Sequence, residues 1–185
     1  MTLKKSETPV NFTVTKSDIL YSGKVFDLKI DEVLYDSGNT GVRQIAVHPG
    51  GAVIVPVFED KLVLVNQFRY PFQKFMLEFP AGKLEINEDP YLCAVRELEE
   101  ETGFTAEKID KLGAIATAPG FCTEILHIYI ALNLTPGETK REEGEFGMEI
   151  VHLKFSEIEN KIKTGEIFDS KTISAFLMTK LYLQV

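Results

Sequence analysis

The sequence predicts an α+β fold in which helices sandwich a mixed β-sheet, with a small antiparallel sheet at the N-terminus. Three observations carry this prediction. Residues 17–48 contain short strand-like runs around a hairpin signal, residues 52–58 form a nearly continuous apolar run, and residues 90–102 lie between a helix start and a helix stop. Strands followed by isolated helices are typical of a mixed sheet with helices on both faces.

The N-terminal part is predicted to be a three-stranded antiparallel unit. Residues 1–16 are polar, and we expect them to be loose. Strands are expected at 19–22, 25–34 and 41–48, with a hairpin turn at Asp36-Ser37-Gly38-Asn39. Three strands bury little surface on their own, so this unit has to pack against something else.

Residues 49–185 are predicted to form the larger domain, and residues 1–48 the smaller one. The apolar run at 52–58 is expected to be a buried strand. Further strands are expected at 62–68, 75–79, 112–117, 124–134 and 149–155. Residues 135–148 are polar and acidic and contain three glycines, which predicts a loop.

A helix is predicted at residues 90–102. Asp89 is a favoured N-cap, Pro90 suits the first helical position, and Gly103 is typical of the residue that ends a helix. With about 100° between successive residues, one face carries Tyr91, Ala94, Val95, Leu98 and Thr102. Glu97, Glu100 and Glu101 fall off that face, so we expect their carboxylates to point away from the core.

Two further helices are predicted near the C-terminus. Ser156-Glu157-Ile158-Glu159 has the pattern of a capping box, and its helix is expected to end near Gly165. Asp169 or Ser170 is expected to cap the final helix. The inward stripe of that helix is expected to comprise Ile173, Phe176, Leu177 and Leu181.

Composition argues against several classes of protein. The chain has 185 residues, a net charge of −8 and 44% hydrophobic residues, which suits one domain with a sizeable core and argues against disorder. A general nucleic-acid binder would need a basic stripe, and we see neither a membrane-spanning run nor a signal peptide. Cys93 and Cys122 have neither a metal-site nor a redox spacing. We therefore expect a cytoplasmic protein with reduced thiols and with neither nucleic acid nor membrane as a partner.

The acidic residues of the predicted helix have a spacing that suits a metal ion. Glu97 and Glu101 are one turn apart, so their carboxylates lie side by side, and like charges at this spacing destabilise a bare helix. A hard divalent cation would reverse that effect, because oxygen ligands suit Mg²⁺ or Mn²⁺. Arg96 lies one turn before Glu100 and could orient it. The alternative is a solvated acidic helix face.

The segment Gly82–Phe104 fits the pattern G-x5-E-x7-R-E-U-x-E-E-x-G-U, where U is apolar, at every fixed position. It resembles the Nudix box, the signature of hydrolases that cut nucleoside diphosphates linked to another moiety. Other segments are similar to the ADP-ribose pyrophosphatase branch of that superfamily, although Ala118 stands where the branch has a serine. These segments are 67–70, 77–82, 118–124, 144–146 and 169–173.

The resemblance implies a metal site and a general base. The metal ligands would be the Ala81 carbonyl, Glu97 and Glu101, with Glu100 assisting a further ion, and the ion would be Mg²⁺ with Mn²⁺ as a possible substitute. The proposed base of the branch falls on Glu145 in the acidic loop, and Glu143 is a close second. On the residues alone, the alternative is a solvated loop.

The resemblance also implies substrate contacts. Arg69 would contact the diphosphate, because a guanidinium fork suits phosphate oxygens. Glu78 and Glu124 would hold substrate or water, and Pro119-Gly120 lies in the motif tied to substrate. Alternatives remain: Arg69 could be a surface arginine at a strand end, and a buried Glu78 could instead form a salt bridge to an arginine.

The expected activity is metal-dependent hydrolysis of a nucleoside diphosphate sugar, with ADP-ribose giving AMP and ribose 5-phosphate. GDP-mannose or another nucleotide sugar is the alternative, and a non-catalytic nucleotide-binding module is a distant one. The N-terminal strands are expected to build a homodimer by exchange, with Arg43 and Phe26 reaching the partner's substrate. The chain has no tryptophan, so Phe26 is also the first candidate to stack on the nucleobase, and Tyr21 a weaker one; the alternative for both is a place in the core.

Overall fold

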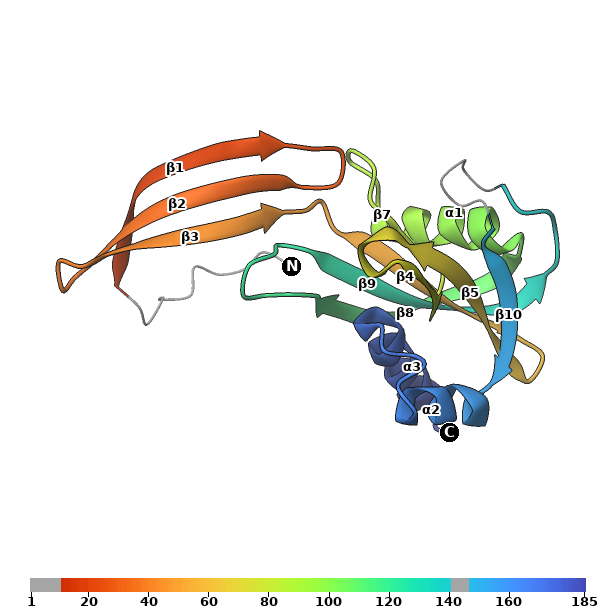
Figure 1. Ribbon diagram of the computed structural model, residues 1–185. Helices are drawn as coiled ribbons and strands as arrows, with labels where there is room; N and C mark the ends of the chain where they lie inside the picture. Colours follow the sequence, from red (N-terminus) through yellow and green to blue (C-terminus); the bar gives the residue numbers. More distant parts are fainter. Residues whose placement is uncertain (1–10, 141–146) are drawn as a thin grey trace. The chain divides into compact units, whose positions relative to one another are not determined.

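The computed structural model describes residues 11–140 and 147–185. The chain divides into two compact units, one of residues 1–48 with 118–123 and the other of residues 49–117 with 124–185. Figure 1 names the helices and strands of both units. Each unit is described by itself below.

The first unit is a three-stranded antiparallel sheet in the order β1-β2-β3. Its strands are β1 (Phe12–Ser22), β2 (Asp27–Tyr35) and β3 (Thr40–Val47). The three predicted strands are confirmed, but the prediction of a loose segment up to residue 16 is wrong from Phe12 onward. Phe12 lies opposite Tyr35 and Ser17 opposite Asp31, so backbone pairing with β2 orders this polar stretch.

The second unit contains a seven-stranded mixed sheet. The strands β10, β5, β4, β9 and β8 follow one another across it, while β6 pairs with β5 and β7 with β4. Only β4 and β9 run parallel among the recorded pairs. The bounds are β4 (Gly51–Phe58), β5 (Lys61–Arg69), β6 (Lys74–Glu78), β7 (Ala81–Lys83), β8 (Thr105–Ala116), β9 (Ile125–Thr135) and β10 (Glu149–Lys154).

Two strands differ from the sequence prediction. β7 is a strand that the sequence did not predict, and it pairs with the start of β4. β8 begins at Thr105, seven residues before the expected strand, because it pairs with β9 from Thr105 opposite Thr135 to Ala116 opposite Ile125. A short 3₁₀ turn (Tyr70–Phe72), which the sequence analysis did not predict, joins β5 to β6.

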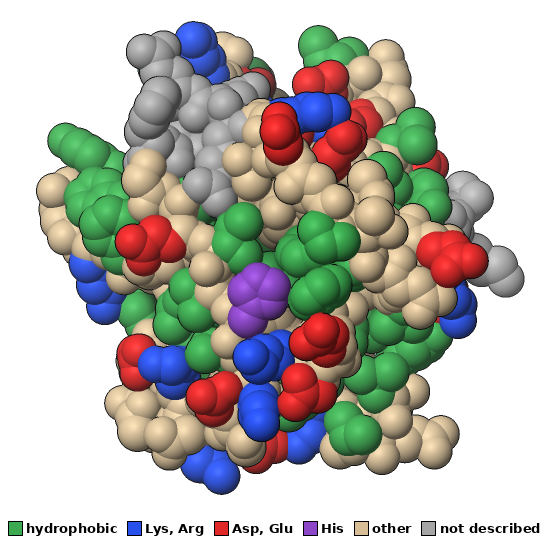
Figure 2. Space-filling view, turned by 90° about the vertical axis from the view of Figure 1, so that its right-hand side faces the viewer, with side chains coloured by type: hydrophobic (Ala, Val, Ile, Leu, Met, Phe, Trp, Pro, Cys, Tyr) green, Lys and Arg blue, Asp and Glu red, His purple; other side chains and the backbone are tan. Residues whose placement is uncertain are grey.

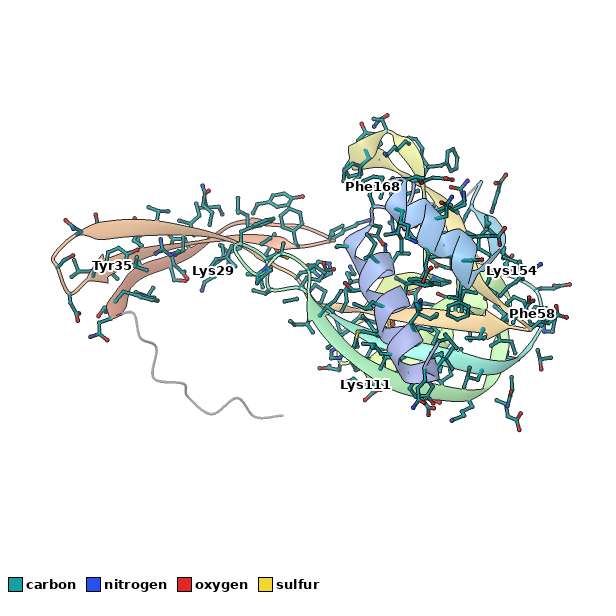
Figure 3. The ribbon with its side chains drawn as sticks, turned by 90° about the horizontal axis from the view of Figure 1, so that it is seen from below. Lys29, Tyr35, Phe58, Lys111, Lys154 and Phe168 are labelled. Atoms are coloured by element: carbon teal, nitrogen blue, oxygen red, sulfur yellow. The ribbon has the colours of Figure 1, made fainter. Side chains whose placement is uncertain are left out.

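Three helices cover the two faces of this sheet: α1 (Pro90–Thr102), α2 (Phe155–Lys163) and α3 (Ser170–Leu183). The side chains of β4 alternate between the two faces, as a strand requires. Ala52 and Ile54 pack with α1, whereas Val53 and Val55 pack with α2 and α3. Figure 1 shows α1 on one face and α2 and α3 on the other, and Figure 3 shows α2 and α3 side by side, which confirms the predicted sandwich.

The ends of α1 agree with the prediction, but its buried face agrees only in part: Ala94, Leu98 and Thr102 are buried, whereas Tyr91 and Val95 are exposed. Asp89 caps the helix and Gly103 ends it with a left-handed φ of 73°. The buried residues are Cys93, Ala94, Glu97, Leu98, Glu101 and Thr102, so the prediction that Glu97 and Glu101 lie off the core face is wrong. The helix contacts β7 as well as β4, and this extra strand lies against the acidic side of the helix.

The C-terminal helices also depart from prediction in detail. Helix α2 begins at Phe155, one residue before the predicted cap, and Glu157 accepts a hydrogen bond of 2.7 Å from the Lys154 backbone N–H. Asp169 caps α3 as predicted. The buried stripe of α3 is Thr172, Ala175, Phe176 and Thr179.

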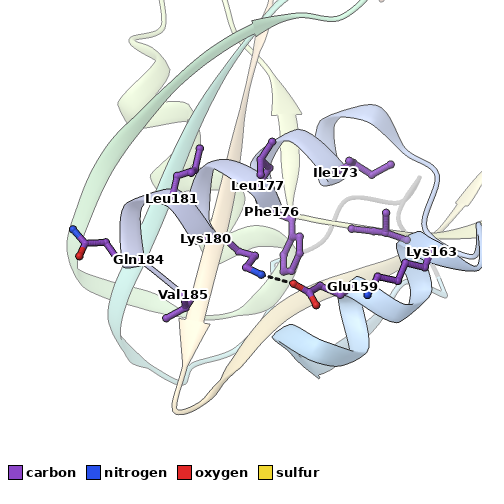
Figure 4. Close-up of a pocket in the computed structure, with 10 residues that line it drawn as sticks. Glu159, Lys163, Ile173, Phe176, Leu177, Lys180, Leu181, Gln184 and Val185 are labelled. Carbon is purple, nitrogen blue, oxygen red and sulfur yellow. Dashed lines mark hydrogen bonds and ion pairs between the residues drawn. The ribbon is translucent and has the colours of Figure 1, made fainter.

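Leu177 and Leu181 of α3 are 57% and 71% exposed, so their predicted inward position is wrong. The smaller Thr172, Ala175 and Thr179 occupy that stripe instead. Together with residues of α2, Leu177 and Leu181 line a mostly apolar groove of about 670 Å³, drawn in Figure 4. An ion pair between Lys180 and Glu159 crosses it.

The surface carries charges of both signs. On the face that Figure 2 shows, basic and acidic side chains are interspersed and hydrophobic side chains lie among them. Among the described residues, no helix is both long and apolar enough to cross a membrane.

Candidate active site

The candidate site includes the contact between α1 and the first residues of β7. The Ala81 backbone N–H donates a hydrogen bond of 3.2 Å to Glu101 Oε2. Glu97 lies against the neighbouring residue, because a Cβ built on Gly82 would be 1.6 Å from Glu97 Oε1. Only glycine leaves room for this approach. Both carboxylates therefore converge on the Ala81-Gly82 backbone.

These two carboxylates are buried, with Glu97 6% and Glu101 3% exposed. Burying charge is costly unless it is paired. Arg96 supplies part of the compensation, since its Nη1 donates to Glu97 Oε1 at 2.6 Å and to Glu100 Oε2 at 2.9 Å. The predicted contact between Arg96 and Glu100 is thus present, and Glu97 shares it.

Glu88 completes the arginine's surroundings. Arg96 Nε and Nη2 donate to its two carboxylate oxygens at 3.0 and 3.1 Å. These hydrogen bonds to Glu88, with the charges of Glu97 and Glu100, raise the pKa of Arg96 above its usual value. In turn, Arg96 lowers the pKa of Glu88. The sequence analysis assigned no role to Glu88, although it occupies a fixed position of the box pattern.

The donor set around Gly82 fits a hard divalent cation. Two buried carboxylates and a backbone turn offer oxygen ligands of the kind that Mg²⁺ and Mn²⁺ prefer. In the part of the chain that the structure describes, no three acidic, histidine or cysteine side chains are arranged as a complete metal site. Arg96 draws Glu100 and Glu97 toward itself in this arrangement. The ligand roles of Ala81, Glu97, Glu100 and Glu101 stay predictions.

A second charged cluster lies at the end of β5. Glu78 is 1% exposed. Arg69 binds it through one edge of the guanidinium: Nε donates to Oε1 at 2.9 Å and Nη2 donates to Oε2 at 2.7 Å. Lys171 also contacts Glu78 and donates to Asp169 at 2.8 Å. The salt bridge considered as an alternative for Glu78 is therefore present. Lys171 was not singled out from the sequence.

The two clusters are electrostatically linked. The hydrogen bond to Glu78 raises the pKa of Arg69, and the negative charges of Glu101 and Asp169 add to that shift. Arg69 is thus influenced by a carboxylate of the box helix as well as by its own partner. This places a cation with a free guanidinium edge within reach of the field of the predicted metal ligands.

Glu124 lies where β8 and β9 meet. Its carboxylate accepts a hydrogen bond of 2.7 Å from the Thr117 hydroxyl, and its carbonyl accepts one of 3.3 Å from the Thr117 N–H. These bonds close the ends of the two strands. A role of Glu124 in holding substrate or water stays a prediction.

Four predicted substrate residues belong to the first unit and are described within it. Arg43 donates to the Val42 carbonyl at 3.1 Å and lies over the Tyr35 ring, 5.8 Å from its centroid. Phe26 is 41% exposed. Their predicted contacts with a partner's substrate are untested.

Pro119 and Gly120 are exposed in a turn of the same unit. The backbone N–H groups of Phe121 and Cys122 both donate to the Ala118 carbonyl, at 3.1 and 2.9 Å. The segment then pairs with the end of β3 through Ala46. The candidate bases Glu143 and Glu145 lie outside the described residues.

Comparisons with known proteins identify the family of this chain. The family model "NUDIX domain" matches residues 48–176. The chain is 42% identical over 163 residues to the methanol dehydrogenase activator of Bacillus methanolicus, covering 86% of this chain and 88% of that protein. It is 41% identical over 177 residues to the ADP-ribose pyrophosphatase of Bacillus subtilis, covering 93% and 95%.

The fold is similar to the crystal structure of an ADP compounds hydrolase, with a TM-score of 0.85 over 97% of each chain. The sequence identity in that pair is 21%, so this likeness supports the fold alone. The family model covers most of the chain, and its match includes the box helix with its buried glutamates. The chain therefore belongs to the Nudix family.

Proposed function

We propose that this Nudix pyrophosphohydrolase cleaves the diphosphate linkage of nucleoside diphosphate sugars, and that ADP-ribose is its preferred substrate. The observation that carries this proposal is the convergence of the buried Glu97 and Glu101 carboxylates on the Ala81-Gly82 backbone. A relative that is 41% identical over nearly the whole chain and bears the name ADP-ribose pyrophosphatase supports the choice of substrate.

Nudix hydrolases generally use divalent metal cations. Here we infer Mg²⁺, with Mn²⁺ as a substitute. Glu97, Glu101 and the Ala81 carbonyl would hold it, and Glu100 would assist a further ion. The bound cations would neutralise the diphosphate and lower the pKa of a water molecule.

The chain's own groups divide the remaining tasks. Arg96 orients Glu97 and Glu100 through its short hydrogen bonds. Arg69 offers its remaining guanidinium edge to a phosphate oxygen. Glu145, or Glu143, would take a proton from the attacking water, and Glu124 would help to hold that water.

The proposed roles imply the following reaction. The water oxygen attacks one phosphorus, the bond from that phosphorus to the bridging oxygen breaks, and a proton passes from the water to the loop carboxylate. ADP-ribose would then yield AMP and ribose 5-phosphate. Because the charge that develops is spread over phosphate oxygens, fixed cations such as Arg69 contribute through position and field.

We further infer a homodimer built through residues 1–48, with residues 49–185 as the hydrolase domain. Among the described residues of the first unit, only Asp31 and Val33 are buried. Large apolar side chains such as Ile19, Leu20 and Val42 are more than half exposed, and such surface favours a partner. A second copy would cover it and bring Phe26 and Arg43 to the neighbouring site.

Light scattering tests the assembly, because a dimer should give about twice the 20.8 kDa chain mass at micromolar concentration. Deleting residues 1–48 should abolish both the dimer and turnover. A fully active monomer would contradict the exchange without touching the metal site. For localisation, we propose the cytoplasm, where Cys93 and Cys122 would stay reduced.

A turnover panel tests the substrate. ADP-ribose, GDP-mannose and other nucleotide sugars should be compared at equal concentration with Mg²⁺, with separation of the nucleoside monophosphate product. We expect the highest kcat/KM for ADP-ribose. A higher value for GDP-mannose would move the assignment to the alternative substrate. An absence of product from every nucleotide sugar would support the non-catalytic module.

A further inference from the structure

Four charged side chains form a continuous row of ion pairs from the start of α3 to the end of β5. Asp169 accepts from Lys171 at 2.8 Å, Lys171 contacts Glu78, and Glu78 receives both donors of one edge of Arg69. Three members of this row are well buried: the side chains of Glu78, Lys171 and Asp169 are 2%, 13% and 15% exposed. Arg69 is the outer end, with 37% of its side chain exposed.

At the inner end of this row, Asp169 is fixed to the backbone by a closed set of hydrogen bonds. Asp169 Oδ2 accepts from the Thr172 N–H at 3.0 Å and from the Thr172 hydroxyl at 2.6 Å. The same hydroxyl oxygen accepts from the Phe79 N–H at 3.1 Å, and Phe79 directly follows Glu78. The cap of α3 and the end of β6 are therefore locked together, and Lys171 has little freedom to move.

Charge pairing explains why two cations meet at Glu78. A carboxylate that is almost fully buried is destabilising unless it is well paired. Arg69 alone would satisfy it, yet Arg69 is the more exposed partner and belongs to the end of a strand. Burial opposes ionisation of Asp169, but the charge and hydrogen bond of Lys171, together with Thr172, hold its pKa below the usual value. Asp169 is consequently negatively charged at neutral pH.

The arrangement fixes the direction of the Arg69 guanidinium. Its Nε and Nη2 edge is committed to Glu78, so the Nη1 side is the one left for another acceptor. Within the described residues, no hydrogen bond from Nη1 is recorded. A lysine that holds Glu78 in place also holds the plane and direction of the group that Glu78 clamps.

We propose that Lys171 is a positioning residue, which acts through Glu78 to aim the free edge of Arg69 at the diphosphate of the substrate. This inference rests on the proposed function, because it needs a diphosphate ligand. Lys171 does not touch that ligand itself. Its contribution is the fixed geometry that a phosphate contact requires.

The test compares Lys171→Met with Arg69→Met and the double variant. Lys171→Met should raise KM for ADP-ribose about tenfold, while kcat changes less, because a phosphate contact made in both ground and transition states affects KM most. The double variant should be no worse than Arg69→Met alone, since a residue that acts only through Arg69 has nothing left to position. Lys171→Arg keeps the charge, so its KM should be close to that of the wild type.

Lys180→Met is the matched control. Lys180 lies on the same helix and also pairs with a glutamate, but its partner Glu159 belongs to α2 and not to the site. Its KM should equal that of the wild type. A KM of Lys171→Met within twofold of the wild type would overturn the proposal. The proposal would also be overturned if adding Lys171→Met to Arg69→Met raised KM by the same factor as Lys171→Met does alone.

Binding of inorganic pyrophosphate, measured by calorimetry, separates this proposal from the proposed activity. Lys171→Met and Arg69→Met should weaken it to the same extent. If the wild type binds pyrophosphate in this way but hydrolyses no nucleotide sugar, the proposed function fails and the positioning role stands. Unchanged pyrophosphate binding in Lys171→Met contradicts the role.

Should Lys171→Met fail to fold, as circular dichroism would reveal, Asp169→Asn replaces it. Asparagine keeps the helix cap but removes the charge that holds Lys171. The same rise in KM is expected with a smaller size, and a wild-type KM in this variant would overturn the proposal.

Discussion

Glu97 Oε1 lies so close to Gly82 that a methyl group on the glycine Cα would be only 1.6 Å from it. The carboxylate on the box helix and the backbone of β7 are therefore fitted to each other without a spare atom between them. This contact explains why the middle position of β7 needs a glycine: the Glu97 carboxylate occupies the space that any side chain would take.

Gly82→Ala should consequently displace Glu97 and reduce kcat/KM for ADP-ribose by about 100-fold, the cost of moving a reactive group by roughly an ångström. Far-UV circular dichroism should stay unchanged, because the rest of α1 keeps its caps. Gly113→Ala is the control, since a Cβ built there meets only the flexible end of the Met178 side chain, which belongs to α3 and not to the site. Equal activity of Gly82→Ala and wild type would show that the contact does not matter for turnover.

The thiol of Cys93 should be inert in the folded protein. Burial raises its pKa to about 12, and the negative charges of Glu88 and Glu97 add to the shift. At pH 8, a disulfide reagent should therefore label Cys122, which is partly buried, and leave Cys93 unmodified until the protein is denatured. Fast labelling of native Cys122→Ser protein would contradict this.

Stability should depend on pH through Glu88. The hydrogen bonds of Arg96 hold its pKa below the usual 4.5, so its contribution is complete above pH 4.5 and is lost as the pH falls through the lower folded-state value. Glu88→Gln should lower Tm by about 2–4 °C at pH 7, which corresponds to about 1 kcal/mol. The difference from wild type should shrink below pH 4. A constant difference across this range would assign the loss to packing.

The acidic loop should contain the general base. Glu145→Gln should lower kcat by about 10²- to 10⁴-fold with little change in KM, because a base acts mainly in the transition state. Glu143→Gln, measured in parallel, is expected to be milder. A reversed order would shift the assignment by two residues, and full activity in both variants would place the base elsewhere.

Local signals in the sequence were reliable where a few neighbouring residues decide the structure. Asp89, Pro90 and Gly103 define the ends of α1 through their own backbone preferences, and the apolar run of β4 needs burial on both faces. The start of β1 at Phe12 could not be found in this way. Its polar residues are ordered by pairing with Asp31–Tyr35, which lie far along the chain.

The buried face of α1 was missed for a related reason. Hydrophobic periodicity records which side chains avoid water, whereas Glu97 and Glu101 are covered by a three-residue strand that the sequence does not announce. Likewise, α3 buries Thr172 and Thr179 and exposes Leu177, because small side chains fit the close contact with the sheet.

In the candidate site, the box pattern singled out the acidic residues and Arg96, and the structure brings them into contact. The salt bridge of Glu78 was considered as an alternative, because a buried carboxylate needs a partner. Lys171 escaped notice because a lysine in the first turn of a helix looks like an ordinary surface residue. Its proposed role depends on a contact with a strand residue that lies 93 positions earlier.

The central claim is that the two buried glutamates of α1 hold the cation on which turnover depends. It is tested most directly by the rate of AMP release from ADP-ribose across a Mg²⁺ titration, for Glu97→Gln and Glu101→Gln against the wild type. Glu99→Gln is the matched control, because Glu99 lies on the same helix but is exposed and pairs with Lys140. Both site variants should fold and lose at least about 100-fold in turnover at saturating Mg²⁺, since a neutral amide cannot replace a charged ligand, while Glu99→Gln keeps wild-type activity. Near-wild-type turnover in either site variant would contradict the account.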